Sequence, residues 1–106
     1  MNVWQRSGVS LIAIPELARA AALSHERIER CAYVLRAMLD SARRIDLHGA
    51  YALDVHDIAF TLSCSPRSIE AIAEGFARPE VALVEGGAIA RWREWAVERT
   101  LSTIFD

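Results

Sequence analysis

The sequence contains no lysine. All twelve basic residues are arginines, and fourteen acidic residues give the chain a net charge of −2. A domain that binds nucleic acid by neutralising phosphates usually carries a basic excess or at least one basic face. The overall charge therefore argues against strong DNA binding by the isolated monomer.

Cysteine is also scarce, and no long hydrophobic run is present. The two cysteines, Cys31 and Cys64, do not form a disulfide framework, which is typical of a protein from a reducing cytosol. The apolar stretch 9–14 is too short to span a bilayer, and no charged region of a signal peptide precedes it. We therefore expect a cytoplasmic protein that does not associate with a membrane.

Glycine and proline are few, at five and three residues, whereas hydrophobic residues make up 53% of the chain. This composition is that of a folded domain and excludes a disordered linker. A chain of 106 residues is long enough to bury one core and too short for a second domain. We expect a single domain over 1–106.

The first half of the sequence predicts two helices. Residues 1–23 are expected to form an N-terminal arm followed by a short helix that begins at Pro15. A core helix is expected over 24–45, with Ser24 as its N-cap. Its apolar residues recur every three or four positions and so gather on one face, at Ile28, Cys31, Ala32, Leu35, Leu39 and Ala42. Residues 50–53 are expected to form one short strand.

Residues 54–78 predict two helices joined by a tight turn. Asp54 is expected to cap the first helix. Ser65 is expected to cap the second, with Pro66 in its first turn. Small or apolar residues take the positions that hold two crossed helices together, namely Ile58, Ala59, Leu62, Ile69, Ile72 and Phe76. This pattern indicates a helix-turn-helix.

Residues 81–91 predict a β-hairpin, because apolar segments flank the turn Glu85-Gly86-Gly87. A last helix is expected over 92–105. The order of helix, turn, helix and hairpin is that of a winged helix-turn-helix, and the expected fold class is mainly α with a small β-hairpin. The alternative is a plain helical bundle, which would leave 81–91 without a role.

The stretch 51–95 resembles the winged-helix N-terminal domains of phage replisome organisers and related DnaD-like replication proteins. The resemblance covers somewhat under half the chain. It lies in short segments along this stretch, namely Asp57-Ile58-Ala59, the run from Ser65 to Glu70, Phe76, Leu83-Val84, Gly86-Gly87 and the run from Ala88 to Trp92. It implies a winged helix that acts on DNA in replication. Two features are expected to depart from the family: we expect no further domain of the kind that replisome organisers usually carry, and the hairpin is poor in basic residues.

We expect the second helix of the motif to approach the bases of double-stranded DNA. The candidate DNA-binding residues on this helix are Ser65, Arg67, Ser68 and Ala71. Glu70 and Glu74 lie on or beside the same face, and residues 54–98 hold four arginines against eight acidic residues. A second basic edge would arise if the fold brought four arginines from two segments together, namely Arg43, Arg44, Arg91 and Arg93.

The C-terminal segment carries more apolar area than one helical face hides in so small a domain. We therefore expect a homodimer whose interface includes Trp92, Trp95, Leu101, Ile104 and Phe105. The alternative is that both tryptophans cover the core of the monomer, because large aromatic side chains dominate core burial as well.

Catalysis is not expected. Carboxylate, imidazole and hydroxyl side chains at Asp54, His56, Asp57 and Ser63 or Ser65 are of the types that acid-base or nucleophilic catalysis uses, but each is expected to have a local task in a cap or a turn. His48, His56 and Cys64 include no close pair of the kind that metal sites use, and Gly86-Gly87 is not followed by the lysine of a phosphate-binding loop. We expect neither a metal nor a cofactor.

Two functions remain open at this point. The first is a DNA-binding winged-helix protein of phage or mobile-element type that acts in replication or transcriptional control. The second is an acidic protein-binding or oligomerising adaptor, for example a replisome scaffold or an inhibitor of a host defence complex, which uses the same surface to contact a protein partner.

Overall fold

A computed structural model describes residues 14–93 of the chain. The expected arm at 1–13 and all but the start of the expected last helix, at 94–105, lie outside the described residues. Within the described range, helices come first and a two-stranded antiparallel sheet follows them. The expectation of a mainly helical chain with a small hairpin is confirmed at this level.

Helix α2 (Pro15–Ser24) is followed after three residues by the longest described helix, α3 (Ile28–Ile45). The prediction that Ser24 caps the second of these helices is wrong. The Ser24 hydroxyl donates to the carbonyl of Ala20 at 2.7 Å, and His25 ends α2 in the left-handed conformation with φ of 57°. Ser24 therefore belongs to α2, and α3 begins four residues later than expected.

Helices α4 (Val55–Thr61) and α5 (Pro66–Ala77) begin at the two predicted caps. The Asp54 carboxylate accepts the N–H of Asp57 at 3.0 Å. The Ser65 hydroxyl accepts the N–H of Ser68 at 3.3 Å, and Pro66 follows at the position where its missing N–H costs nothing. These caps satisfy backbone groups that a helix start leaves without partners.

Strands β1 (Val84–Glu85) and β2 (Ala88–Ile89) form an antiparallel hairpin in which Val84 pairs with Ile89. Gly86 and Gly87 make the turn with φ of 59° and 79°, as a two-residue hairpin turn with two positive φ angles requires. The strands are shorter than the expected segment 81–91. The N–H groups of Val81 and Ala82 both donate to the carbonyl of Arg78, so the chain turns there.

The strand expected over 50–53 is reduced to an isolated bridge between Ala50 and Ala88. The N–H of Ala52 donates to the buried hydroxyl oxygen of Ser41 at 2.7 Å, so it is used by α3 and not by the hairpin. Closer to α3, the carbonyl of Gly49 accepts the N–H of Ile89 at 2.8 Å. The N–H of Tyr51 donates to the carbonyl of Gly87 at 3.3 Å, so two backbone hydrogen bonds join the loop after α3 to the hairpin.

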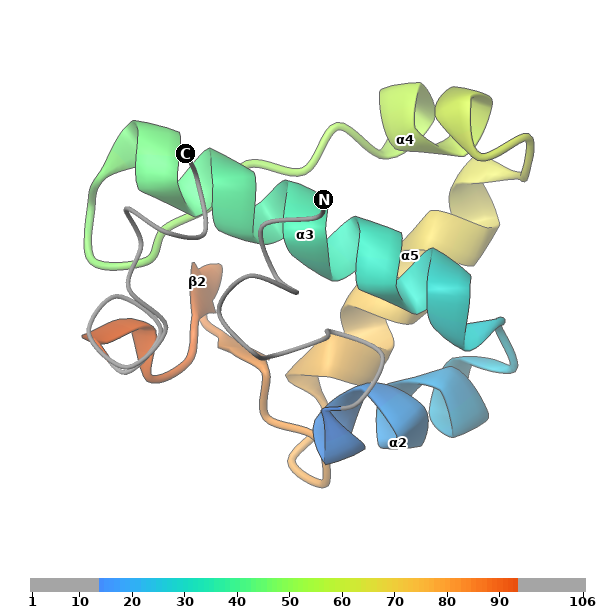
Figure 1. Cartoon of the computed structure of the whole chain (residues 1–106), viewed down its shortest axis with the longest axis horizontal. Helices are drawn as coiled ribbons and strands as arrows, with labels where there is room; N and C mark the ends of the chain where they lie inside the picture. The colour runs from blue at the N-terminus through green and yellow to red at the C-terminus, as the bar shows by residue number, and fades with distance from the viewer. Residues whose placement is uncertain (1–13, 94–106) are drawn as a thin grey trace.

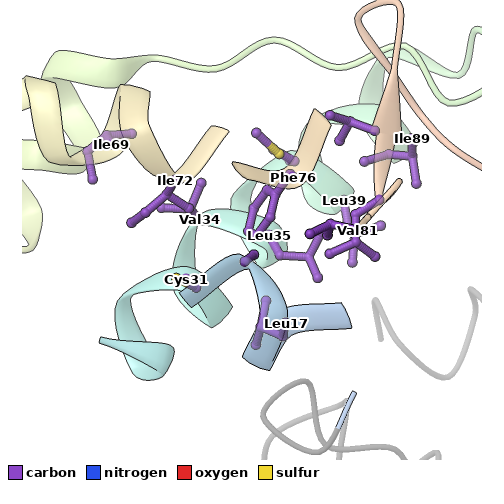
Figure 2. Packing of buried hydrophobic residues seen from close by; sticks show 14 of the residues in the cluster. Leu17, Cys31, Val34, Leu35, Leu39, Ile69, Ile72, Phe76, Val81 and Ile89 are labelled. Carbon is purple, nitrogen blue, oxygen red and sulfur yellow. The ribbon is translucent and has the colours of Figure 1, made fainter. Parts of the chain in front are cut away.

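The core lies where α2, α3, α5 and the hairpin meet. Figure 1 shows α2 and α4 near opposite ends of α5, with α3 crossing in front. Phe76, at the end of α5, lies in the middle of the buried cluster and is surrounded by side chains of the other elements, as Figure 2 shows. The fully buried side chains near it include Leu17, Leu35, Leu39 and Ile72.

Candidate nucleic-acid interface

Helix α5 has one face fixed in the core and one face open to solvent. Ile69, Ile72 and Phe76 have no exposed surface, so they hold the helix from the inside. On the opposite side Arg67, Glu70 and Glu74 are exposed and Ala71 is half-buried. These four residues line an open hollow of about 390 Å³. The four predicted contacts of this helix, Ser65, Arg67, Ser68 and Ala71, are therefore exposed or half-buried at its start and outer side.

The first turn of α5 is held in a fixed geometry. The hydroxyl groups of Ser65 and Ser68 lie 3.3 Å apart, and the same Ser65 oxygen accepts a backbone N–H, so both hydroxyl groups are partly occupied. Arg67 makes no ion pair with any residue that the structure describes. Its guanidinium is thus available to a phosphate or to the edge of a base.

The outer face of α5 is net negative. Glu70 and Glu74 stand four residues apart, and neither forms an ion pair with another residue in 14–93. Arg78, which is four residues after Glu74, instead pairs with Glu80 at 3.1 Å. The same contact is a hydrogen bond from the Arg78 guanidinium to the Glu80 carboxylate, and it lowers the pKa of Glu80.

A second hollow, of about 620 Å³, lies at the base of the hairpin. Its lining combines His48, from the loop after α3, with Glu85, Ile89 and residues 90–93. Arg91 and Arg93 therefore share a site with a histidine and the half-buried Trp92. Arg91 also forms an ion pair of 3.7 Å with Glu16 of α2, so part of its charge is already compensated.

The other two predicted arginines, Arg43 and Arg44, lie exposed in the last turn of α3. They do not line the hollow that contains Arg91 and Arg93. Their charges do act on Asp40, whose pKa is raised by burial while Arg36, Arg44 and Arg43 oppose the rise. Of the four arginines expected to form one basic edge, two line the hollow at the base of the hairpin and two lie in the last turn of α3.

Trp92, the first residue of the predicted oligomer interface, is half-buried and packs against the core. A Cβ built on Gly49 would lie 2.8 Å from its Cβ atom, so the tryptophan sits directly on the backbone of the loop after α3. This contact agrees with the alternative in which Trp92 covers the monomer core. The remaining predicted interface residues, Trp95, Leu101, Ile104 and Phe105, lie outside the described residues.

One exposed aromatic residue was missed in the sequence analysis. Phe60 of α4 is 86% exposed, the largest value among the exposed large hydrophobic side chains of the described range. Helical periodicity predicts that Phe60 is exposed, because the inward face is formed by Val55, Ile58 and Leu62 and position 60 lies outside this face. Asp57, on the same outer side of α4, is exposed as well.

The residues considered for catalysis or metal binding do not converge on a site in the described range. Asp54 and Ser65 act as helix caps. Within residues 14–93, no group of three histidine, cysteine, aspartate or glutamate side chains is placed to hold a metal ion. The same range contains no helix long and apolar enough to cross a membrane.

Comparison with known proteins adds no relative. No protein family, no curated protein and no solved structure matches this chain. Functional inference therefore rests on the geometry and charge of the described residues and on the sequence resemblance described above.

Proposed function

We propose that this chain is a DNA-binding protein of the winged helix-turn-helix type, in which α5 enters the major groove of double-stranded DNA. One observation carries the proposal. Helix α4, a four-residue turn, helix α5 and a hairpin follow one another, and α5 is held by Ile69 and Ile72 while its outer face stays open. This is the order and the orientation that a recognition helix needs.

The start of α5 supplies the contacts that suit DNA. Recognition helices use residues near their N-terminus to reach the bases. Arg67 lies in the first turn and has no ionic partner in the described range. At the hairpin base, Arg93 and Arg91 add positive charge beside the groove, where phosphate contacts fix the position of a protein on the duplex.

The biological setting of this proposal comes from the sequence resemblance. A winged helix similar to those of phage replisome organisers would act in replication or in transcriptional control. A homodimer would present two copies of α5 to two half-sites, separated by about one helical turn of DNA, roughly 34 Å.

Salt-dependent binding tests the function. Replacing Arg67 by alanine is expected to weaken binding to duplex DNA, by about 1–3 kcal/mol for a lost base contact, whereas the loss of a phosphate contact would also reduce the slope of log affinity against log salt by about 1. Fluorescence anisotropy with labelled duplexes at several salt concentrations measures both quantities. Arg19→Ala is the matched control, because Arg19 is exposed on α2, near the far end of α5.

The control variant is expected to bind like the unmodified protein. If the full chain is not retained on any duplex even at low salt, or if both variants weaken binding equally, a specific role of α5 in DNA binding is ruled out.

A second function, an acidic protein-binding adaptor, is favoured by the surface of α4. Phe60 is 86% exposed, and the exposed carboxylates of Asp54 and Asp57 lie on the same short helix. An aromatic side chain beside negative charges suits a partner that offers an apolar pocket with a basic rim. In this case α4, and not α5, would be the main contact.

The two functions predict different results when position 60 is used for protein crosslinking. With a photo-crosslinking amino acid at position 60, the adaptor function predicts one defined protein adduct in the producing cell, which Asp57→Lys abolishes and Arg67→Ala leaves unchanged. DNA binding through α5 predicts no defined protein adduct at position 60 and full sensitivity to Arg67→Ala in the anisotropy measurement.

A further inference from the structure

The outer face of α5 carries one cation and two carboxylates in a fixed order. Counted from Arg67, the next members of this face follow after three, four and seven residues, at Glu70, Ala71 and Glu74. This spacing places them in one continuous row along the helix. The row is open to solvent, whereas the opposite side of α5 is buried. The order from the start of the helix is a cation, a carboxylate, a methyl group and a second carboxylate.

The stability of the helix does not account for this row. Carboxylates four residues apart on a helix repel each other. Glu70 and Glu74 have this spacing, and no ion pair within residues 14–93 compensates either of them. The one cation that could pair with Glu74 at helical spacing, Arg78, is bound to Glu80 at 3.1 Å. The charges are therefore free to meet a ligand.

A carboxylate that faces the major groove is compatible with only some bases. Phosphates repel it, so it gains only where a base offers a hydrogen-bond donor. Cytosine presents its N4 amino group as a donor, whereas adenine places the acceptor N7 next to its N6 amino group. A glutamate with two acceptor oxygens therefore fits cytosine better than adenine. The guanine paired with that cytosine presents two acceptors, N7 and O6, which suit an arginine.

We propose that α5 reads a G·C base pair, in which Arg67 donates to guanine N7 and O6 and Glu70 accepts the N4 amino proton of cytosine. This inference rests on the proposed function, since α5 must lie in the major groove. Arg67 and Glu70 are about one helical turn apart on the same face of α5 and can reach the two bases of one pair. Ala71 ends at its Cβ, so no side chain beyond it holds the helix away from the base edges.

Glu74 has a different part in this arrangement. It lies seven residues after Arg67, about 10 Å farther along the helix axis, beyond the N-terminal residues that reach bases. Its charge faces the phosphate backbone and weakens binding to every sequence alike. Glu70 and Glu74 thus provide a matched pair: the same side chain on the same face, with only one of the two in contact with a base.

Selection from a pool of random duplexes by the full chain tests the inference, followed by anisotropy titrations on the selected duplex. The unmodified protein is expected to require one G·C pair, with a loss of about 10-fold or more when that pair is replaced. Glu70→Gln is expected to relax the preference for cytosine at this pair, because the neutral glutamine amide can also bind adenine N6 and N7, while Arg67 still favours the guanine. Glu74→Gln is expected to raise the affinity for all duplexes and to leave the preference unchanged.

The outcomes separate the inference from the function on which it rests. Selected duplexes without a required G·C pair, or a Glu70→Gln variant with the preference of the unmodified protein, overturn the inference while DNA binding stands. Equal effects of Glu70→Gln and Glu74→Gln on all duplexes also overturn it, since both carboxylates would then act only by repulsion. If no duplex is retained at low salt, the proposed function itself is wrong.

Discussion

Gly49 shows how a single residue joins two parts of the chain. It is buried, has φ of 89°, and its carbonyl accepts the N–H of Ile89 at 2.8 Å. A Cβ atom built on it would lie 2.8 Å from the Cβ of Trp92 and 3.1 Å from the carbonyl oxygen of Ile89. Both the backbone angle and the lack of space therefore require glycine here.

Gly49→Ala is expected to lower the free energy of unfolding by roughly 2–4 kcal/mol, which combines the cost of positive φ with that of overpacking. Gly86→Ala is the control, because Gly86 also has positive φ, 59°, but an added Cβ would meet nothing within 4 Å. Its expected cost is about 1 kcal/mol. Urea unfolding followed by tryptophan fluorescence measures both, and equal losses would show that contact with Trp92 does not matter.

Capping residues show which contacts can be predicted from sequence. Asp54 and Ser65 were predicted correctly because each accepts an N–H group only three residues away. Ser24 was assigned to the wrong helix, since its hydroxyl binds the carbonyl of Ala20 behind it. The partner of Ser41, the N–H of Ala52, is eleven residues away and followed from no local pattern.

The packing of helix α2 on α5 was not predicted from the sequence. This helix was predicted as a short helix after an arm, yet it packs closely on α5, the proposed recognition helix. A Cβ built on Gly75 of α5 would lie 3.4 Å from the carbonyl oxygen of Ala20, so the two helix backbones approach each other closely. Because α5 is clamped between α2 and α4, its outer face is held in a fixed orientation.

Two leucines of α2 test this role. Leu17→Ala is expected to lower the free energy of unfolding by about 2–5 kcal/mol, since Leu17 is fully buried against the core. Leu23→Ala, on the same helix, is expected to change it by no more than about 0.5 kcal/mol, because that side chain is 39% exposed. Thermal unfolding of both variants gives the comparison. Similar small shifts in the unfolding midpoint temperature of the two variants would mean that α2 is not part of the cooperative core.

At the scale of the whole molecule, charge decides what the surfaces can bind. The chain is slightly acidic overall, and of the four arginines predicted as one basic edge, two line the hollow at the hairpin base and two lie in the last turn of α3. The outer face of α5 keeps Arg67 together with two carboxylates. Phosphates would repel these carboxylates, so such a surface would bind DNA tightly only where a base donates a hydrogen bond to a carboxylate. Sequence preference and salt dependence therefore test the proposed DNA binding.

The sequence by itself determined the features that arise within a few residues of each other: the two capped helices, the turn between them, the inward positions of Ile69 and Ile72, and the diglycine hairpin. Helical periodicity, capping chemistry and positive φ depend on residues that are close in sequence, so they can be predicted from the sequence. Only the tertiary structure decided the features that join distant segments. The packing of α2 on α5 and the contact of Gly49 with Trp92 depend on how complete helices and loops pack. Side-chain volumes across the core, not neighbours in sequence, set that packing.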